Sequence, residues 1–247
     1  MPQGTVVLTA TVHDPVGRLA SATQRLAEPL RAIFAEIAVN VSDATRPEVL
    51  RALETLGATI MTHAAGEPII GRARRDAVGM APGRPVLYAD FDHMLRWVEF
   101  GAEDLRRVLA AQPEADMLVV GRSPQALASE PQRLQQSERL VNHVHALLTG
   151  GSWDLMFAIR RLSPAAAELI VGQSKVDTLA NDVEWPLLAR RAGLSTGYVE
   201  SDALFYRTVE EFGDAADGGD GDPLQWIRRI EFAALHASAM RAYLPDH

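Results

Sequence analysis

The first hundred residues alternate between apolar β-type runs and amphipathic helical runs, and this alternation constrains the fold more than any other feature. Pro47 begins one helical run at its first turn, and Gly57 follows as a stop signal. The expected strands are residues 5–11, 33–41 and 58–62, and the expected helices are residues 18–30 and 47–56. Because the links are short, the order predicts an α/β fold: a mostly parallel sheet with helices on both faces.

A fourth apolar run, 86–89, is followed by two carboxylates, Asp90 and Asp92, on either side of Phe91. Side chains two apart on extended backbone can point to the same side, where two carboxylates repel each other. Mg²⁺ and Mn²⁺ prefer oxygen ligands and usually hold substrate phosphates as well. The motif therefore predicts a site for one of these ions, with His93 close enough to assist. The alternative is a polar turn in which Asp92 caps the next helix.

The predicted sheet brings further polar residues to the same edge. Ligands of open parallel sheets bind at the carboxyl ends of the strands. Five residues follow the expected strands and are expected to share this rim: His13, Asp14, Asp43, Asp90 and Asp92.

Arg72, Arg74 and Arg75 form the densest basic cluster, on a helical run just before the fourth strand. Guanidinium groups suit phosphate, because they combine charge with paired donors. Their directions around a helix differ, so at most one or two would reach a ligand. The alternative is a solvated helix face.

A second group of acids, Asp182 and Glu184, stands at the start of a helix that ends near Gly193. The helix dipole favours the ionised carboxylate there, which suits a general base. A simple N-terminal helix acid is the alternative. Trp185 is a candidate for stacking on a sugar ring, and a buried core position is the other interpretation.

The second half of the chain shows more strand and helix signals and no domain boundary. Ser163 is an expected N-cap, and the Gly-rich acidic run 214–222 is expected to be mobile; it lacks the spacing of a calcium loop. The expected strands are residues 116–121, 153–159, 194–199 and 203–207, and the expected helices are residues 94–100, 103–110, 131–148 and 223–244.

Composition excludes several classes of protein. With 247 residues the chain suits one large domain that ends in the C-terminal helix. Its formal net charge of −8 argues against a general nucleic-acid binder. Cysteine is absent, which excludes disulfides and thiolate chemistry. No signal peptide or membrane-spanning run is visible, so a cytoplasmic location is expected.

Taken in order, these segments resemble GT-A-fold glycosyltransferases, in particular those like family 2. The likeness covers about residues 6–207, and Asp90–Asp92 matches the Asp-X-Asp metal motif of that class. It implies a single domain with a nucleotide-binding half at about 1–100 and an acceptor-side half at about 101–210. The other matching segments are residues 6–11, 41–43, 73–76, 153–161, 181–182 and 190–193.

The resemblance implies transfer of a sugar from a UDP- or GDP-linked donor to an unidentified acceptor, with Mn²⁺ or Mg²⁺ as cofactor. It implies nucleotide contacts from Thr9, Ala10, Thr11, Asp43, Arg74, Arg75 and Asp90. It implies metal ligands Asp90 and Asp92, with His93 as a third candidate, a general base at Asp182 or Glu184, and acceptor contacts from Trp185 and Arg160. A homodimer is left open.

Two departures from the pattern keep alternatives open. Asn181 stands where an acid is usual, and Tyr206–Arg207 stand where many members end a strand with a metal-binding His. The alternatives are a nucleotidyltransferase on the same fold, a phosphohydrolase with Asp90 as nucleophile, and a domain that binds nucleotide or sugar without transfer.

Overall fold

The computed structural model describes residues 6–213 and 217–244, and its centre is a seven-stranded sheet in the order β3-β2-β1-β4-β6-β5-β7. The strands are β1 Val7–Val12, β2 Ile37–Ser42, β3 Thr59–His63, β4 Val86–Asp90, β5 Met117–Arg122, β6 Ile159–Leu162 and β7 Thr196–Ser201. β2 and β5 are buried along their whole length, whereas the edge strand β3 is mostly exposed. The sheet is mostly parallel, as predicted.

β6 is the one antiparallel strand of this sheet, and it lies between β4 and β5. β4 lies beside β1 in the middle of the sheet, with Thr11 in register with Asp90. The residues that follow β1 and the acids that follow β4 therefore meet at one edge, as the parallel order requires.

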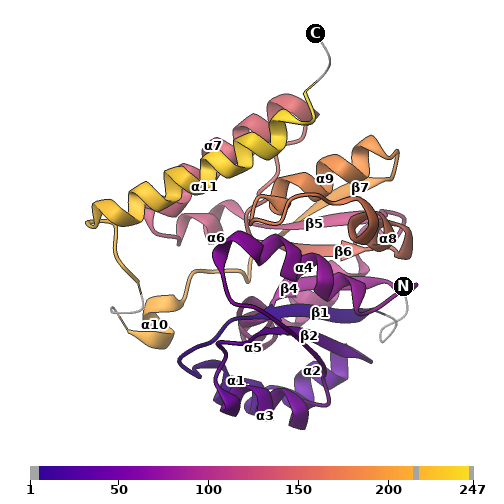
Figure 1. Ribbon diagram of the computed structural model, residues 1–247, viewed down its shortest axis with the longest axis vertical. Helices are drawn as coiled ribbons and strands as arrows, with labels where there is room; N and C mark the ends of the chain where they lie inside the picture. The colour runs from indigo at the N-terminus through magenta and orange to yellow at the C-terminus, as the bar shows by residue number, and fades with distance from the viewer. Residues whose placement is uncertain (1–5, 214–216, 245–247) are drawn as a thin grey trace.

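Helices cover both faces of the sheet (Figure 1). The first face is covered by α1 Leu19–Arg25, α2 Ala27–Ile33, α3 Pro47–Leu56 and α5 Phe91–Ala110. The second face is covered by α4 Ile70–Gly79, α8 Pro164–Gln173 and α9 Asn181–Arg191. Apolar side chains from each set pack on the sheet, which is the burial that stabilises such layers.

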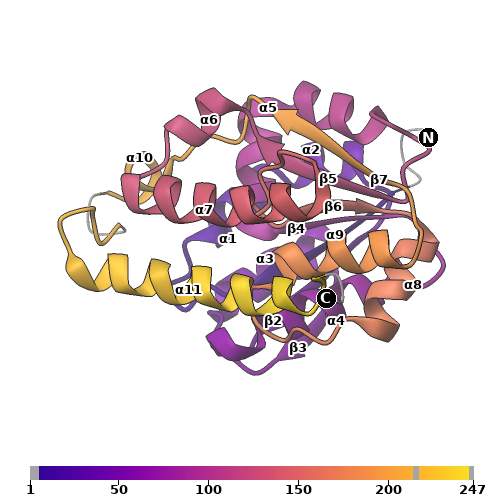
Figure 2. The ribbon, with the colours of Figure 1, turned by 90° about the horizontal axis from the view of Figure 1, so that it is seen from above.

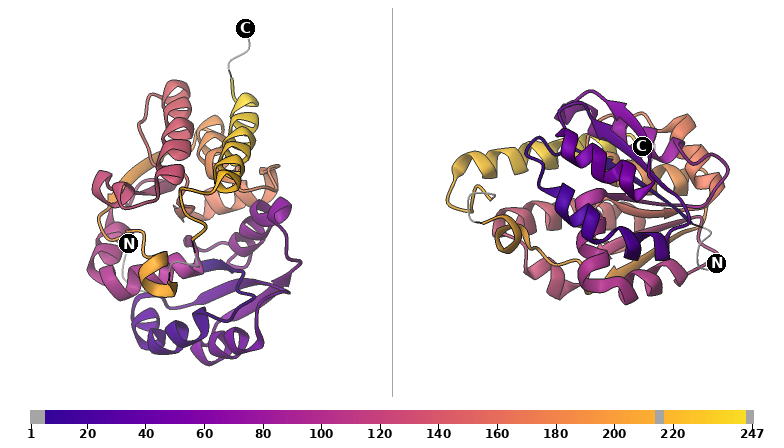
Figure 3. Two further views of the ribbon diagram at one scale, coloured as in Figure 1. Left: turned by 90° about the vertical axis from the view of Figure 1, so that its left-hand side faces the viewer. Right: turned by 90° about the horizontal axis from the view of Figure 1, so that it is seen from below.

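Two long helices, α7 Gln132–Thr149 and α11 Pro223–Arg241, pack on each other at one end of the molecule (Figure 2). Figure 3 shows the first hundred residues on one side of the molecule and these helices on the other. Within the described residues, no helix is both long and apolar enough to span a bilayer.

The expected helix over residues 18–30 is wrong in one respect, because the chain forms two helices joined at Leu26. Pro29 has no N–H, and its ring opposes a continuous helix through the preceding turn. α2 runs on to Ile33, so β2 begins at Ile37 and not at residue 33.

Other expected boundaries are also corrected. β6 is Ile159–Leu162, and Ala158 before it has φ 56°, which interrupts an extended run over residues 153–159. Residues 203–207 form no strand, and α10 Thr208–Phe212 follows them. Asp90 occupies the N-cap position of α5, and Asp92 lies in its first turn, so Asp92 is not the cap. The short helix α6 Pro124–Ala128 was not expected.

The acidic run 214–222 is partly described, and residues 214–216 lie outside the described part. Asp217 and Asp220 pair with Arg133 of α7. These ion pairs connect the described part of the run to α7.

α10 comes close to α5 through a glycine. Gly101 interrupts the helical geometry of α5, and a Cβ there would lie 2.3 Å from the Cβ of Ala203. Any side chain at this position would push the chain before α10 outward. Gly101 thus lets α10 reach the edge of the sheet where the acids lie.

Candidate functional site

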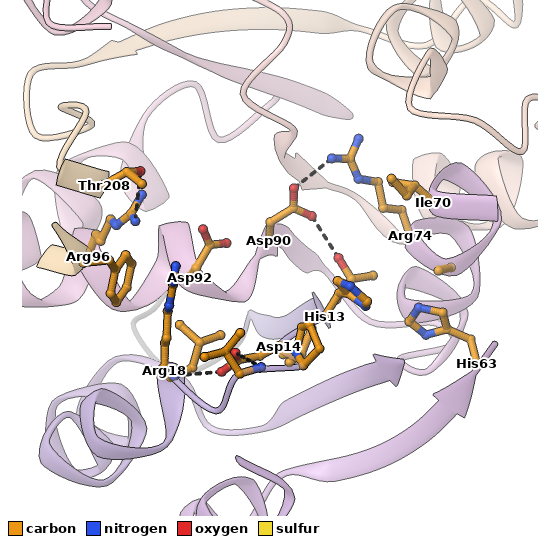
Figure 4. Close-up of a pocket in the computed structure, with 17 residues that line it drawn as sticks. His13, Asp14, Arg18, His63, Ile70, Arg74, Asp90, Asp92, Arg96 and Thr208 are labelled. Carbon is orange, nitrogen blue, oxygen red and sulfur yellow. Dashed lines mark hydrogen bonds and ion pairs between the residues drawn. The ribbon is translucent and has the colours of Figure 1, made fainter. Parts of the chain in front are cut away.

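A cavity of about 530 Å³ lies at the carboxyl ends of β1 and β4 (Figure 4). We call one end the β3 end, formed by His13, His63, Ile70, Ala73 and Arg74. We call the other the α10 end, formed by Arg18, Asp92, Arg96, Thr208 and Phe212. The remaining lining residues are Thr11, Val12, Asp14, Pro15, Val16, Leu19 and Asp90.

Asp90 lies between the two ends and is held by three donors. Its Oδ1 accepts hydrogen bonds from the hydroxyls of Thr11 (2.9 Å) and Tyr88 (2.6 Å). Its Oδ2 accepts from Arg74 Nη2 at 2.8 Å. Burial opposes ionisation here, but the positive charge of Arg74, a smaller effect of His93 and the hydrogen bonds from Tyr88 and Arg74 together outweigh it and lower the pKa of Asp90 to about 2. Asp90 is therefore a fixed anion at neutral pH.

Arg74 joins Asp90 to the start of α9. Its Nη1 donates to Asp182 Oδ1 at 3.0 Å and to Asn181 Oδ1 at 3.1 Å. The guanidinium is 9% exposed, and despite desolvation its two carboxylate partners raise its pKa. Asn181 supplies an acceptor without adding a third negative charge, which explains physically why an amide fits there.

α4 approaches the loop before α9 closely because residue 71 is glycine. A Cβ on Gly71 would lie 2.2 Å from the carbonyl oxygen of Thr178 and 2.7 Å from that of Val176. The backbone N–H of Arg72 donates to the carbonyl of Asp177. This contact places Arg74 within reach of both carboxylates.

The loop after β1 is held by Asp14. Its carboxylate accepts from the backbone N–H groups of Gly17 and Leu19, each at 2.8 Å. Arg18 and His13 on either side are exposed and line the cavity. The sequence thus placed His13 and Asp14 correctly at the rim.

Asp92 is the carboxylate best placed for a metal ion. Its side chain is 40% exposed and accepts no hydrogen bond from a described residue, while His93 Nε2 lies 3.8 Å from its Oδ2. His93 itself stacks on Phe157 at 4.2 Å and does not line the cavity. In the described part of the chain, no three His, Asp or Glu side chains gather as a metal cage. The donors fit an ion shared between Asp92 and a ligand's phosphates, since Mg²⁺ commonly takes one or two carboxylates and substrate oxygens.

The α10 end carries two arginines beside an aromatic ring. The guanidinium carbons of Arg18 and Arg96 lie 5.1 and 5.8 Å from the centre of the Phe212 ring. Arg96 Nε also donates to Glu211 at 2.7 Å. Arg96 is thus balanced by Glu211, whereas Arg18 has no carboxylate partner among the described residues and offers positive charge at the same end as Asp92.

Several residues expected to bind nucleotide do not line the cavity. Thr9 and Ala10 are fully buried inside β1, and only Thr11 of the three reaches the cavity. Asp43 is exposed, and its Oδ1 accepts from the Ala65 N–H at 2.8 Å. Arg75 points to Asp177 instead, at 2.6 Å.

The candidate base Glu184 and the candidate acceptor contacts Trp185 and Arg160 stabilise the fold in this conformation. Glu184 is 3% exposed and accepts from Ser174 and from the backbone N–H groups of residues 175 and 176. Trp185 packs edge-on against Tyr88. Arg160 is 1% exposed and donates to the carbonyl oxygen of Asp182 at 2.9 Å, and burial lowers its pKa to about 10.

Asp182 lies behind Arg74 and does not line the cavity. It is 6% exposed, and His236 Nε2 of α11 lies 3.8 Å from its Oδ2. Its ion pair with Arg74 links it to the site indirectly.

Among the polar and aromatic residues of the cavity, the sequence analysis missed Arg18, His63, Arg96, Thr208 and Phe212. Two had a usable signal. Arg96 is four residues after Asp92 on the same helix face. His63 directly follows the third predicted strand and belonged on the rim by the same rule as Asp43. Thr208 and Phe212 carry no such signal, since they arrive through the path of the chain after β7.

No protein-family model matches the chain, and no curated protein matches it in sequence. Among solved structures, glucosyl-3-phosphoglycerate synthase of Mycobacterium tuberculosis matches with a TM-score of 0.63 and 12% identity, over 98% of this chain and 82% of that chain. Its complex with UDP matches with a TM-score of 0.64 and 14% identity, over 98% and 82%. Its complex with Mn²⁺, UDP and phosphoglyceric acid matches with a TM-score of 0.62 and 11% identity, over 98% and 80%. The chain therefore has the fold of the GT-A glycosyltransferases, as the sequence predicted.

Proposed function

We propose that this protein is a glycosyltransferase that uses a nucleotide-diphosphate sugar and a divalent cation. The observation that carries the proposal is the cavity at the ends of β1 and β4, where the carboxylate of Asp92, which accepts no hydrogen bond from a described residue, lies beside Arg18 and Arg96. A cation site next to positive side chains suits a diphosphate, which carries several negative charges. The solved structures with the same fold include complexes with UDP, Mn²⁺ and UDP-glucose.

Within this proposal, Asp92 holds the Mn²⁺ or Mg²⁺, which neutralises charge on the departing nucleoside diphosphate. Arg18 and Arg96 add positive charge at the same end of the cavity. Asp90 keeps Arg74 in place and contributes oxygen atoms at the centre of the cavity; its own oxygens already accept three hydrogen bonds. Asp92 is thus the stronger candidate of the two for the metal.

Asp182 is proposed for two tasks. It holds Arg74 from the side opposite Asp90, and it is the candidate general base for the acceptor hydroxyl. The second task needs the acceptor to reach a carboxylate that is 6% exposed, so it requires movement of Arg74. Transfer activity and nucleotide binding therefore respond differently to its removal.

The experiment measures nucleotide-sugar binding by calorimetry with and without Mn²⁺, and donor turnover by release of nucleoside diphosphate. UDP-glucose and GDP-linked sugars are the first donors, because UDP-glucose occupies the solved structures of this fold. D92N is expected to lose the metal-dependent part of the affinity, at least tenfold. D202N changes an exposed Asp outside the cavity and is the control.

Equal affinity of wild type and D92N with Mn²⁺ would refute the metal role of Asp92. No binding of any nucleotide sugar would refute the proposed function itself. D182N is expected to retain binding within a few-fold and to lose turnover.

A second candidate is a protein that binds the nucleotide sugar without transferring it. The specific observation in its favour is the burial of Asp182 behind Arg74. Tight binding of a donor with no turnover across a panel of sugar, lipid and phosphorylated acceptors would select this candidate.

A further inference from the structure

The β3 end of the cavity contains a hydrogen-bond relay whose direction can be assigned atom by atom. Asn40 of β2 is fully buried, and its Nδ2 lies 2.9 Å from the carbonyl oxygen of Ala73. A carbonyl oxygen only accepts, so the NH₂ group of Asn40 must face Ala73. The amide oxygen of Asn40 then faces the other way, toward His63.

This orientation selects the tautomer of His63. The Nδ1 atom of His63 lies 3.0 Å from Asn40 Oδ1, which is an acceptor, so Nδ1 must carry a proton. In the neutral ring, Nε2 is then the unprotonated nitrogen with a lone pair. Nε2 forms no hydrogen bond with a described residue, and Figure 4 shows the ring extending from β3 toward His13 and the cavity.

The charges around His63 keep the ring neutral near pH 7. Desolvation by burial lowers its pKa, and His13 on the β1 loop lowers it further, against the opposing effects of Asp43 after β2 and Asp76 on α4. Arg74, also on α4, lines the same end. At a pH above about 6.5, the ordinary pKa of histidine, the ring of His63 is therefore neutral and presents an acceptor to the cavity.

The other walls of the β3 end suit a flat aromatic group. Ile70 and Ala73 supply apolar surface there, whereas Arg18 and Arg96 lie at the α10 end. A nucleotide with its phosphates at the α10 end would place its base at the β3 end. Asp43 does not line this cavity, because it is exposed and bonded to Ala65.

We propose that Nε2 of His63 reads the nucleotide base by accepting the ring N–H of uracil or guanine. This inference rests on the proposed function, because it names the base that the same site takes. Uracil and guanine carry a lactam N–H on the edge used for base pairing. Cytosine and adenine carry a ring nitrogen with a lone pair at that position, which would oppose the lone pair of His63. Leaving a buried polar group unpaired in this way strongly disfavours the wrong ligand.

The proposal makes binding depend on pH in a specified direction. Protonation of Nε2 turns the acceptor into a donor that faces another N–H. The affinity should then be full above the pKa of His63 and fall as the pH decreases through it. The loss of one such hydrogen bond corresponds to about a tenfold weaker affinity.

The test uses calorimetry with Mn²⁺ at pH 7.5 and pH 5.0, with sugar nucleotides as ligands. Both phosphates of a sugar nucleotide are esterified, so no phosphate proton titrates in this range. Between pH 7.5 and pH 5.0, wild type is expected to lose up to about tenfold more of its affinity for UDP- or GDP-glucose than H63Q does. Glutamine retains an acceptor and does not titrate, so H63Q removes only the proton switch.

One control separates His63 from the other histidines: H143Q changes an exposed histidine on α7 outside this cavity and is expected to show the wild-type dependence on pH. H13Q removes the neighbouring ring that lowers the pKa of His63, so it is expected to move the loss of affinity to higher pH without abolishing it. Thermal unfolding at each pH confirms that the variants remain folded.

A further ligand isolates the contact itself. An N3-methylated UDP-glucose lacks the ring N–H, so it is expected to bind wild type about tenfold more weakly than UDP-glucose does at pH 7.5. H63F lacks the acceptor and is expected to bind the two ligands with equal affinity. Identical dependence on pH in wild type and H63Q overturns the inference. CDP- and ADP-glucose binding as tightly as the uracil and guanine donors also overturns it. Absence of binding by every sugar nucleotide at every pH instead overturns the proposed function, so the two failures are distinguishable.

Discussion

The buried cluster around Arg74 and the open α10 end contain similar side chains and differ in what balances their charge. Arg74 is 9% exposed and lies between two carboxylates, Asp90 and Asp182, within 3.0 Å of each. Arg18 is exposed and faces an aromatic ring, with no carboxylate partner among the described residues. The first arrangement is complete without a ligand, and the second leaves positive charge available for one.

This difference follows from solvation. A charge removed from water must be paired and hydrogen-bonded, or the folded state loses several kcal/mol. An exposed charge is already solvated, so its attraction to a ligand is weaker and is screened by salt. The Arg74 cluster should therefore dominate stability, and the α10 end should dominate affinity for an anion.

The largest effect is expected for R74A. Removing the guanidinium leaves Asp90 and Asp182 without their shared cation, which should lower the free energy of unfolding by about 3–5 kcal/mol. R72A changes an arginine on the same helix whose side chain is 63% exposed, and it should stay within about 0.5 kcal/mol of wild type. Urea unfolding measures both. Equal stability of the two variants would show that the buried cluster is not a stabilising unit.

A smaller effect is expected for G71A. The added methyl would meet the backbone carbonyls of Thr178 and Val176, so α4 must shift, at a cost of about 1–3 kcal/mol. G79A at the end of the same helix meets only ordinary contacts with Val171 and should be neutral or slightly stabilising. Urea unfolding measures both variants. Equal free energies of unfolding for G71A and G79A would show that Arg74 does not depend on the close contact between α4 and the loop before α9.

The smallest effect on stability is expected for R18A. Its side chain is exposed, so unfolding should change by less than about 0.5 kcal/mol, while affinity for a sugar nucleotide should fall by about 0.5–1 kcal/mol at low salt. The difference from wild type should shrink as salt rises from 20 to about 150 mM, because the Debye length contracts to about 8 Å. R51A, an exposed arginine of α3 outside the cavity, is the control for net charge. A loss that is equal for R18A and R51A would mean that general charge, and not this end of the cavity, attracts the ligand.

Much of the fold was predictable because it depends on local patterns. Pro47 and Gly57 mark both ends of α3, and Ser163 caps α8 as expected. The apolar run before Asp90 forms a buried strand beside β1 because short links and alternating elements leave few other topologies. Residues 153–159 and 203–207 were misplaced, because their conformation depends on contacts with distant parts of the chain. Such contacts leave no periodic pattern in the local sequence.

The candidate site was predictable only in part. Strand ends placed Thr11, His13, Asp14, Asp90 and Asp92 at one cavity, since the carboxyl ends of parallel strands meet at one edge. Residue type alone did not show that Arg74 turns inward while Arg72 and Arg75 turn away. That outcome depends on the close contact of Gly71 with the loop at residues 176–178.

The sequence by itself determined the alternation of strands and helices in the first hundred residues, the edge where polar groups gather and the presence of a carboxylate pair there. Those properties follow from hydrophobic period, turn residues and chirality, which act over a few residues at a time. Only the tertiary structure decided that Asp90 is bound by Arg74 while Asp92 stays open, and that His63 faces the cavity as an acceptor. Both outcomes depend on partners that are distant in sequence, and burial makes each unpaired polar group costly enough to select one arrangement.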